Sequence, residues 1–207
     1  MKELPNGLEL TDVVMKIDIN DLCMLHYAAF EGSLNTLAGK KYLYSFFNWF
    51  IENSDTIFIV SKYKGKICGY ALGAPIGYEK NINKDLFWVA FTGLVVRPWR
   101  LLNKKLILNI YKRLMIILGN SGVKTNVTDE LSGKGISLVG IAVSKEFKGS
   151  SVASSLILAF EEKSKMLQFD FNRLSVHKEN IRAQRFYEKS NWKKIEISNC
   201  IYYYKYN

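Results

Sequence analysis

The order of apolar and polar residues predicts helices and strands along the first part of the chain. Residues Leu10–Ile17 alternate between the two classes, which is typical of a strand. Asp18 or Asn20 then provides a cap for a helix whose apolar residues recur every three to four positions up to Ala29. A second helix is expected over Lys40–Ile51, where six of twelve residues are aromatic.

The middle of the chain predicts further strands. Thr56–Tyr63 and Lys66–Leu72 flank the turn residues Lys64-Gly65 and form a predicted hairpin. Phe87–Val96 is rich in aromatic and β-branched residues and is interpreted as another strand. A polar loop is expected over Thr125–Gly135.

The last third of the chain alternates strands with helices. An apolar strand over Ile136–Val143 leads into a Gly/Ser-rich turn and a helix, and a short strand at Leu174–Val176 precedes a second helix. The chain ends in a predicted hairpin of Trp192–Ile197 and Cys200–Tyr204. We expect one α/β domain over residues 1–207, with a mixed, mostly antiparallel central sheet of about seven strands flanked by helices.

The turn before the first of these two helices has the features of an anion site. Gly149 allows close approach of a ligand to the backbone, and Ser150 and Ser151 add hydroxyl donors at the start of the helix. The unpaired N–H groups and the positive end of the helix dipole favour a phosphate there. The turn lacks the glycine spacing of both a Walker loop and a dinucleotide-binding loop.

Two segments together resemble the GNAT superfamily of N-acetyltransferases. Residues 148–156, Lys-Gly-Ser-Ser-Val-Ala-Ser-Ser-Leu, occupy the frame of the family's pyrophosphate-binding loop. Residues 180–192 resemble its second signature, Asn-x-x-Ala-x-x-Phe-Tyr-x-x-x-Gly-Phe, with Asn191-Trp192 in place of Gly-Phe. Lys148, Ser151 and Ala153 also depart from the family's usual residues.

The resemblance implies a fold, a co-substrate and a set of site residues. Its fold separates the fourth strand from the next one, and acetyl-CoA binds in the opening. Gly140, inside an apolar strand, suits such a site because it indicates a bulge or a close backbone approach. The residues that the resemblance assigns to acetyl-CoA are Ile141, Ala142, Val143, Lys148, Gly149, Ser150, Ser151, Val152, Ala153, Ser154, Asn180 and Tyr187.

Acetyl transfer also needs an acid for the leaving thiolate and a neutral amine. The resemblance makes Tyr187 the candidate general acid. His26, on the first helix, and Glu130, before the fourth strand, are candidate bases, and a water chain is an alternative. His177 is interpreted as structural. Asn180 is expected to cap its helix in addition to any ligand contact.

Composition excludes several other classes. Cys23, Cys68 and Cys200 are odd in number and widely spaced, so we expect reduced, mostly buried thiols in a cytoplasmic protein. Neither the two histidines nor the cysteines have the spacing of a metal site, and Met1–Pro5 does not begin a signal peptide. A hydrolase elbow, Gly-x-Ser-x-Gly, is absent.

The formal net charge of +10 calls for anionic partners. Acetyl-CoA accounts for part of this excess, and no nucleic-acid partner is expected. The acceptor is predicted to be a small primary amine, with a nucleotide-linked amino sugar favoured because the aromatic second helix offers stacking surfaces. Protein lysine or N-terminal acetylation, and coenzyme binding without turnover, are alternatives.

An additional basic and apolar helix is expected over residues 98–119, opened by Pro98. Its cations fall mainly on one side and its apolar residues on the other. Packing onto the domain's own sheet is the simplest interpretation. Peripheral contact with an anionic membrane, or a homodimer interface, is the alternative, because the segment is more apolar than a surface helix requires.

Overall fold

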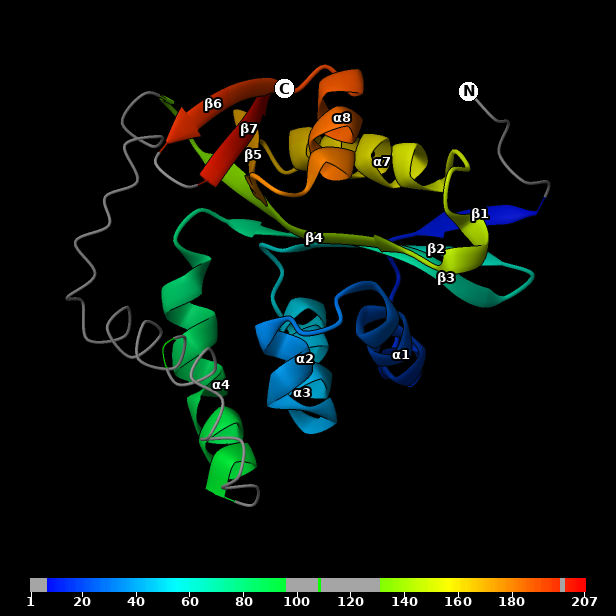
Figure 1. Cartoon of the computed structure of the whole chain (residues 1–207), viewed down its shortest axis with the longest axis vertical. Coiled ribbons are helices and arrows are strands. Elements are labelled where there is room, and N and C mark those ends of the chain that lie inside the picture. The colour runs from blue at the N-terminus through cyan, green and yellow to red at the C-terminus, as the bar shows by residue number, and fades with distance from the viewer. Residues whose placement is uncertain (1–6, 96–107, 109–130, 198–199) are drawn as a thin grey trace.

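The computed structural model describes residues 7–95, 108, 131–197 and 200–207. A single seven-stranded sheet forms its centre, with helices on both faces (Figure 1). The strands are β1 (Leu8–Thr11), β2 (Ile57–Tyr63), β3 (Lys66–Pro75), β4 (Gly135–Val143), β5 (Phe171–His177), β6 (Lys193–Ile197) and β7 (Cys200–Tyr206). The helices are η1 (Lys16–Asp18), α1 (Ile19–Ala29), α2 (Leu34–Ala38), α3 (Lys40–Glu52), α4 (Tyr78–Val95), η3 (Lys145–Phe147), α7 (Val152–Met166) and α8 (Ile181–Lys189).

The strand order is β1-β2-β3-β4-β5-β7-β6, and every neighbouring pair except one is antiparallel. The exception is β4 with β5, which are parallel and pair only at Gly135–Ser137 with Phe171–Arg173. Beyond these three pairs the two strands separate. The predicted mixed, mostly antiparallel sheet of about seven strands is therefore confirmed. The separation of β4 from β5 leaves an opening between these two strands.

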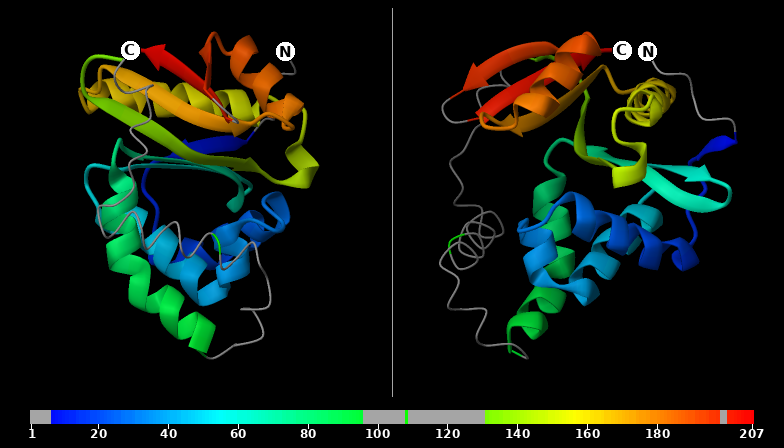
Figure 2. Two further views of the ribbon diagram at one scale, coloured as in Figure 1. Left: turned by 60° about the vertical axis from the view of Figure 1, so that its left-hand side comes forward. Right: turned by 45° about the vertical axis from the view of Figure 1, so that its right-hand side comes forward.

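The two faces of the sheet carry separate hydrophobic cores. Helices α1, α3 and α4 cover one face, and α7 and α8 cover the other (Figure 2). The aromatic residues of α3 are the largest contribution to the first core: Tyr42, Phe46, Phe47, Trp49 and Phe50 are all buried there. Burying side chains of this size is a dominant source of stability. Consequently they do not provide the exposed stacking surfaces that the sequence suggested for an amino-sugar acceptor.

Several predicted elements are confirmed. The hairpin of β2 and β3 turns at Lys64 and Gly65, both of which have positive φ. The helix predicted at Lys40–Ile51, the strand at Ile136–Val143 and the final hairpin appear within a few residues of their expected bounds. Asn191 adopts a left-handed conformation with φ 62°, the conformation that the family's glycine would adopt there.

The predicted strand at Phe87–Val96 is wrong, because residues 87–95 belong to helix α4. Gly77, with φ 93°, ends the extended segment after β3. Ile82 and Leu86, four residues apart, are then buried against α3, and the Trp49 indole donates to Asp85 Oδ2 at 2.9 Å. A helical face that packs well outweighs the strand preference of aromatic and β-branched residues.

The predicted first strand is shorter than expected. β1 ends at Thr11, and Val13, Met15 and Ile17 are exposed. Their alternation with polar residues therefore does not reflect a buried strand face. The predicted helix at 98–119 lies outside the described residues apart from Leu108, so its packing, membrane contact and part in a homodimer stay predictions.

Candidate functional site

The opening between β4 and β5 contains unpaired backbone and an irregular strand. Opposite β3, the register of β4 shifts by one residue at Val139, between the pairs Leu72–Gly140 and Gly73–Leu138. This is the bulge that Gly140 predicted. A Cβ atom at Gly140 would meet no heavy atom within 4 Å, so the glycine faces open space rather than a packed neighbour.

The backbone of β4 beyond the bulge is free to bind an extended ligand. Ser144 N–H donates to the Cys68 carbonyl of β3 at 2.8 Å, and Ala142 pairs with Tyr70 of β3. Because peptide groups alternate in direction along a strand, those of Ile141 and Val143 face the opening. This is the position at which the resemblance places the pantetheine arm of acetyl-CoA.

The loop after β4 presents an anion site at the start of α7. Gly149 has φ 84° and nothing within 4 Å of its Cβ position, so a residue with a side chain would be strained there. Ser150 Oγ donates to the Phe147 carbonyl at 2.6 Å and accepts from Val152 N–H at 3.3 Å, which shapes the turn. The hydroxyls of Ser144 and Ser151 are buried and have no partner among the described residues.

Those two unsatisfied hydroxyls test whether the residues fit a phosphate group. A buried hydroxyl without a hydrogen bond is unfavourable, and of the two only Ser151, the N-cap residue of α7, lies at the helix start where an anion would accept from it. The open space at Gly149 and the unpaired N–H groups of the first turn of α7 satisfy the other requirements. The chemistry of the loop therefore fits the pyrophosphate of acetyl-CoA.

Helix α8 positions Tyr187 on the opposite side of the opening. Asn180 caps the helix, as predicted, with its Oδ1 accepting from Ala183 N–H at 3.1 Å. Tyr187 is 6% exposed, and its ring packs against Phe186, Trp192 and Tyr203 at centroid distances of 5.2 to 5.8 Å. Burial raises the pKa of the Tyr187 hydroxyl, so the phenol stays protonated at neutral pH and can act as a donor.

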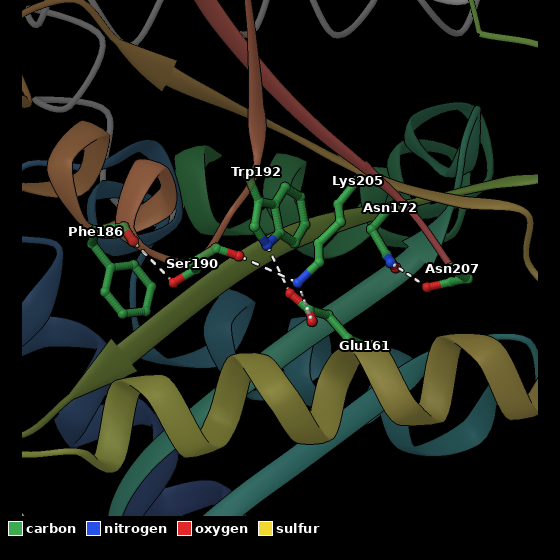
Figure 3. Close-up of polar contacts among 7 residues, drawn as sticks. All are labelled: Glu161, Asn172, Phe186, Ser190, Trp192, Lys205 and Asn207. Atoms are coloured by element: carbon green, nitrogen blue, oxygen red, sulfur yellow. Dashed lines mark hydrogen bonds and ion pairs between the residues drawn. The ribbon is translucent and has the colours of Figure 1, made fainter. Parts of the chain in front are cut away.

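A polar cluster fixes the end of α8 against α7 and β7 (Figure 3). Glu161 on α7 accepts from the Trp192 indole and from Lys205 Nζ, each at 2.8 Å. Lys205 also donates to the Ser190 carbonyl at 3.2 Å, while Ser190 Oγ donates to the Phe186 carbonyl at 2.9 Å. Trp192, which replaces the family's phenylalanine, thus adds a hydrogen bond that holds the helix carrying Tyr187.

These segments surround one cleft with a volume of about 570 Å³. Its walls come from the end of α1, from β4 and β5, from the loop before α7, and from α8. Nine of the residues predicted to bind coenzyme line it: Ile141, Val143, Lys148, Gly149, Ser150, Ala153, Ser154, Asn180 and Tyr187.

The other predicted residues lie elsewhere. The side chains of Ala142 and Val152 are buried in the two cores, and Ser151 is buried beside the loop. His26 is buried among Phe30, Phe46, Phe47 and Tyr70 and does not line the cleft. Glu130 lies outside the described residues.

The surroundings of His26 make it a weak base. Its Nδ1 lies 2.7 Å from the Tyr70 hydroxyl, and its Nε2 is buried without a partner among the described residues. Burial lowers the pKa of His26 to about 4, which leaves little driving force for removing a proton from an ammonium group. Phe30, whose ring centroid is 4.8 Å from that of His26, does line the cleft.

Sequence reasoning missed other cleft residues. Phe30 at the end of α1 and Arg182 on α8 line the cleft. His177, which was interpreted as structural, is exposed and also lines the cleft. Arg182 lies within the second signature and brings a cation to the coenzyme side, a signal that was present in the sequence. Phe30 could not be found this way because its position depends on how α1 packs across the sheet.

The described residues include no group of three or more His, Cys, Asp or Glu side chains that could hold a metal ion. Within the same residues, no helix is long and apolar enough to span a bilayer. Cys23 and Cys68 are free, buried thiols, as expected. Burial raises the pKa of the Cys23 thiol to about 11 and also raises that of Cys68, so both stay protonated.

Three features together are typical of the GNAT acetyltransferase fold. They are the opening between the parallel strands, the anion site at a helix start and the buried tyrosine. Residues 117–192 match the family model described as "Acetyltransferase (GNAT) family". The matched range includes both segments, 148–156 and 180–192, that carry the resemblance. A search of curated protein sequences finds no match.

Solved structures with the same fold cover nearly the whole chain. An N-acetyltransferase from Staphylococcus aureus Mu50 is 12% identical, with a TM-score of 0.61 over 97% of this chain and 99% of that one. The PaiA N-acetyltransferase from Thermoplasma acidophilum, solved with coenzyme A, is 12% identical, with a TM-score of 0.55 over the same shares. The ribosomal-protein-S18-alanine N-acetyltransferase from Escherichia coli is 9% identical, with a TM-score of 0.54 over 95% and 90%.

Proposed function

We propose that this protein transfers the acetyl group of acetyl-CoA to the primary amine of a small molecule. The observation that carries the proposal is the single cleft in which an anion-binding loop, an unpaired stretch of β4 and a buried, protonated Tyr187 meet. Acetyl-CoA supplies an acetyl thioester, and the products are an amide and the free thiol.

In this reaction the residues of the chain would hold acetyl-CoA in place and transfer protons. The loop at Lys148–Ser151 and Arg182 would hold the phosphates, and the peptide groups of Ile141 and Val143 would hold the arm between β4 and β5. Tyr187 would give its hydroxyl proton to the departing sulfur and regain a proton when the acceptor nitrogen is deprotonated. Glu130 and a water chain stay as predictions for the group that receives the proton of the amine.

The alternative function is the same acetyl transfer, with the N-terminal amine of a protein as the acceptor. Among the similar folds is an N-acetyltransferase of a ribosomal-protein alanine, which shares the fold at 9% identity. A nucleotide-linked amino sugar loses its main support, because the aromatic residues of α3 lie in the core. We therefore retain a small primary amine as the acceptor class without the sugar.

The test is thiol release from acetyl-CoA with a panel of diamines, amino acids, amino sugars and short peptides. Release with small amines and not with peptides supports the proposal, and the reverse supports the rival. Acetyl-CoA should also raise the melting temperature, because it binds the native state. A melting shift without release from any amine would identify a coenzyme-binding module without turnover.

A cleft variant separates binding from folding. Gly140→Val adds a β-branched side chain to a strand at a position with free space, so the variant should fold with an unchanged melting temperature. Its side chain would occupy the opening and should weaken acetyl-CoA binding at least tenfold. Equal affinity in the variant would place the coenzyme outside the opening between β4 and β5.

A further inference from the structure

His177 is the cleft side chain, within the described part of the protein, that can accept a proton near neutral pH. The titratable side chains that line the cleft are those of Lys148, His177, Arg182 and Tyr187. Ammonium and guanidinium groups have no lone pair to offer, which excludes Lys148 and Arg182. Burial raises the pKa of the Tyr187 hydroxyl, so this phenol is a proton donor. No described aspartate or glutamate lines the cleft.

The imidazole of His177 is accessible, in contrast to that of His26. His177 is exposed and ends β5, beyond the point at which this strand separates from β4. The ring of His26 is buried and does not line the cleft. An imidazole exchanges its proton with water in the neutral pH range, which suits a group that takes a proton from an ammonium ion and then releases it.

The position of His177 on β5 identifies the side of the sheet that its side chain faces. Leu174 and Val176 are buried in the core beneath α7 and α8. Because side chains alternate along a strand, Ser175 and His177 face the other side of the sheet. Phe30 follows α1 on that side and lines the same cleft. The cleft is therefore accessible from the side of α1 at His177.

Tyr187 and His177 form parts of opposite walls of the cleft. Tyr187 belongs to α8, which covers one face of the sheet, whereas His177 faces the other side. In the tetrahedral intermediate of acetyl transfer, the departing sulfur and the attacking nitrogen occupy different corners around the carbonyl carbon. An acid on one wall and a base on the other suit these two atoms.

We propose that His177 is the general base that removes a proton from the ammonium group of the acceptor. This inference rests on the proposed acetyl transfer and adds a catalytic residue to it. A ring nitrogen of His177 takes the proton, and the amine nitrogen uses the lone pair that it recovers to form the C–N bond as the C–S bond breaks. The sulfur takes the proton of Tyr187, and the Tyr187 oxygen regains one from the amide nitrogen. The imidazolium then releases its proton to water.

Other groups around His177 contribute to any pH profile of the reaction. Those that line the cleft are Lys148, Arg182 and Tyr187. Cys200 is the strand partner of His177 on β7. Its neighbours in the chain are Lys178 and Glu179, and Glu31 follows Phe30 at the end of α1. Because these groups are the same in the full chain and in a variant of His177, the comparison of the two profiles isolates the imidazole.

The experiment measures thiol release at saturating acetyl-CoA between about pH 5 and pH 9. The acceptors are lysine, 1,4-diaminobutane, glucosamine and 2-phenylethylamine. The proteins are the full chain, His177→Gln, His177→Ala and the control Lys178→Gln, which changes the next, exposed residue outside the cleft. Calorimetry with coenzyme A and thermal denaturation measure coenzyme affinity and folding independently of turnover.

His177→Gln should lower kcat/KM for the amine about a hundredfold at pH 7 with every acceptor that the full chain acetylates. The rate of the full chain should rise with pH and level off above the range in which an imidazole titrates. The rate of the variant should continue to rise up to pH 9, because it depends on amine that is already neutral in solution. Lys178→Gln should keep the profile of the full chain.

Coligand and folding measurements separate a base from a coenzyme contact. Both His177 variants should keep the coenzyme affinity and the melting temperature of the full chain, because an exposed side chain is removed. Imidazole added to the solution should restore part of the rate of His177→Ala and none of that of Lys178→Gln, which has lost no base. A loss of coenzyme affinity that accounts for the whole fall in kcat/KM, with an unchanged pH profile, would overturn the proposal.

Failure of the inference is distinguishable from failure of the proposed function. Thiol release that is equal in His177→Gln and in the full chain at every pH would leave acetyl transfer intact and reject His177 as the base. Absence of thiol release from the full chain with all four amines would reject acetyl transfer to small amines, and the role of His177 with it.

Discussion

At the scale of single residues, Tyr187 combines burial with access to the cleft. Its ring is enclosed by Phe186, Trp192 and Tyr203, while part of the side chain lines the cleft wall. This surrounding raises the pKa of the hydroxyl, so the phenol keeps its proton at neutral pH.

Replacing Tyr187 by phenylalanine should lower turnover by about a hundredfold or more. The ring and its packing are kept, so coenzyme affinity and melting temperature should change little. Steady-state kinetics and calorimetry on the same preparation measure both effects. Unchanged turnover would reassign Tyr187 to the core.

Because His26 is buried, we expect the stability of the protein to depend on pH. Its folded pKa of about 4 lies below the ordinary value of 6.5, so the unfolded chain binds the proton more readily. The contribution is therefore fully present above pH 6.5 and is lost as the pH falls towards 4. Between pH 6.5 and pH 5 the free energy of unfolding should fall by about 2 kcal/mol from this residue.

Urea denaturation of the full chain and His26→Gln across this range measures the difference. Carboxylates titrate in both proteins, so they cancel in the comparison. The two proteins should differ less at pH 5 than at pH 7, because the variant has no proton to gain. A constant difference between them would show that His26 titrates normally in the folded state.

At the scale of elements, the position of α8 depends on the contacts of Glu161. Its carboxylate joins the Trp192 indole after α8 to Lys205 on β7, and all three groups are only partly exposed (Figure 3). Glu161→Ala would leave a half-buried ammonium and an indole N–H without their shared acceptor.

We expect Glu161→Ala to lower the free energy of unfolding by about 1–3 kcal/mol. Glu162→Ala is the matched control, because it changes the neighbouring, exposed glutamate of the same helix. Thermal or urea denaturation compares the two. Equal stability of the two variants would mean that the cluster does not hold α8.

The element scale also shows where sequence patterns succeed. The hairpin turn at Lys64-Gly65 and the cap at Asn180 are correct because each depends on residues within a few positions of one another. The strand predicted at Phe87–Val96 fails because its composition favours a strand, while burial of Ile82 and Leu86 against α3 stabilises a helix. That contact lies more than thirty residues away in the chain.

At the scale of the whole molecule, the formal net charge of +10 raises the question of nucleic-acid binding. Two cations, Lys148 and Arg182, line the cleft and are assigned to the coenzyme phosphates. A bound coenzyme would thus neutralise only the positive charge in the cleft. The remaining positive charge would attract nucleic acids without preference for a base sequence.

We expect duplex and single-stranded nucleic acids to bind weakly at low salt and to be released at about 200 mM salt. Fluorescence anisotropy with labelled oligonucleotides of several sequences measures this, with acetyl-CoA binding as the control that persists. A complex that prefers one sequence and survives that salt concentration would contradict the expectation.

The sequence alone determined the local conformation of the two segments predicted to bind a ligand: the loop at Gly149 before α7 and the helix from Asn180 to Tyr187. Backbone conformation and capping within such segments depend on neighbours in the chain, so their pattern is visible in the sequence. Only the tertiary structure decided that β4 and β5 separate after Ser137, that His26 is buried in the core, and that His177 lines the cleft. These properties depend on strand pairing and on packing between segments that are distant in the chain. That packing decides which side chains are buried, which charges have partners and which residues line the cleft.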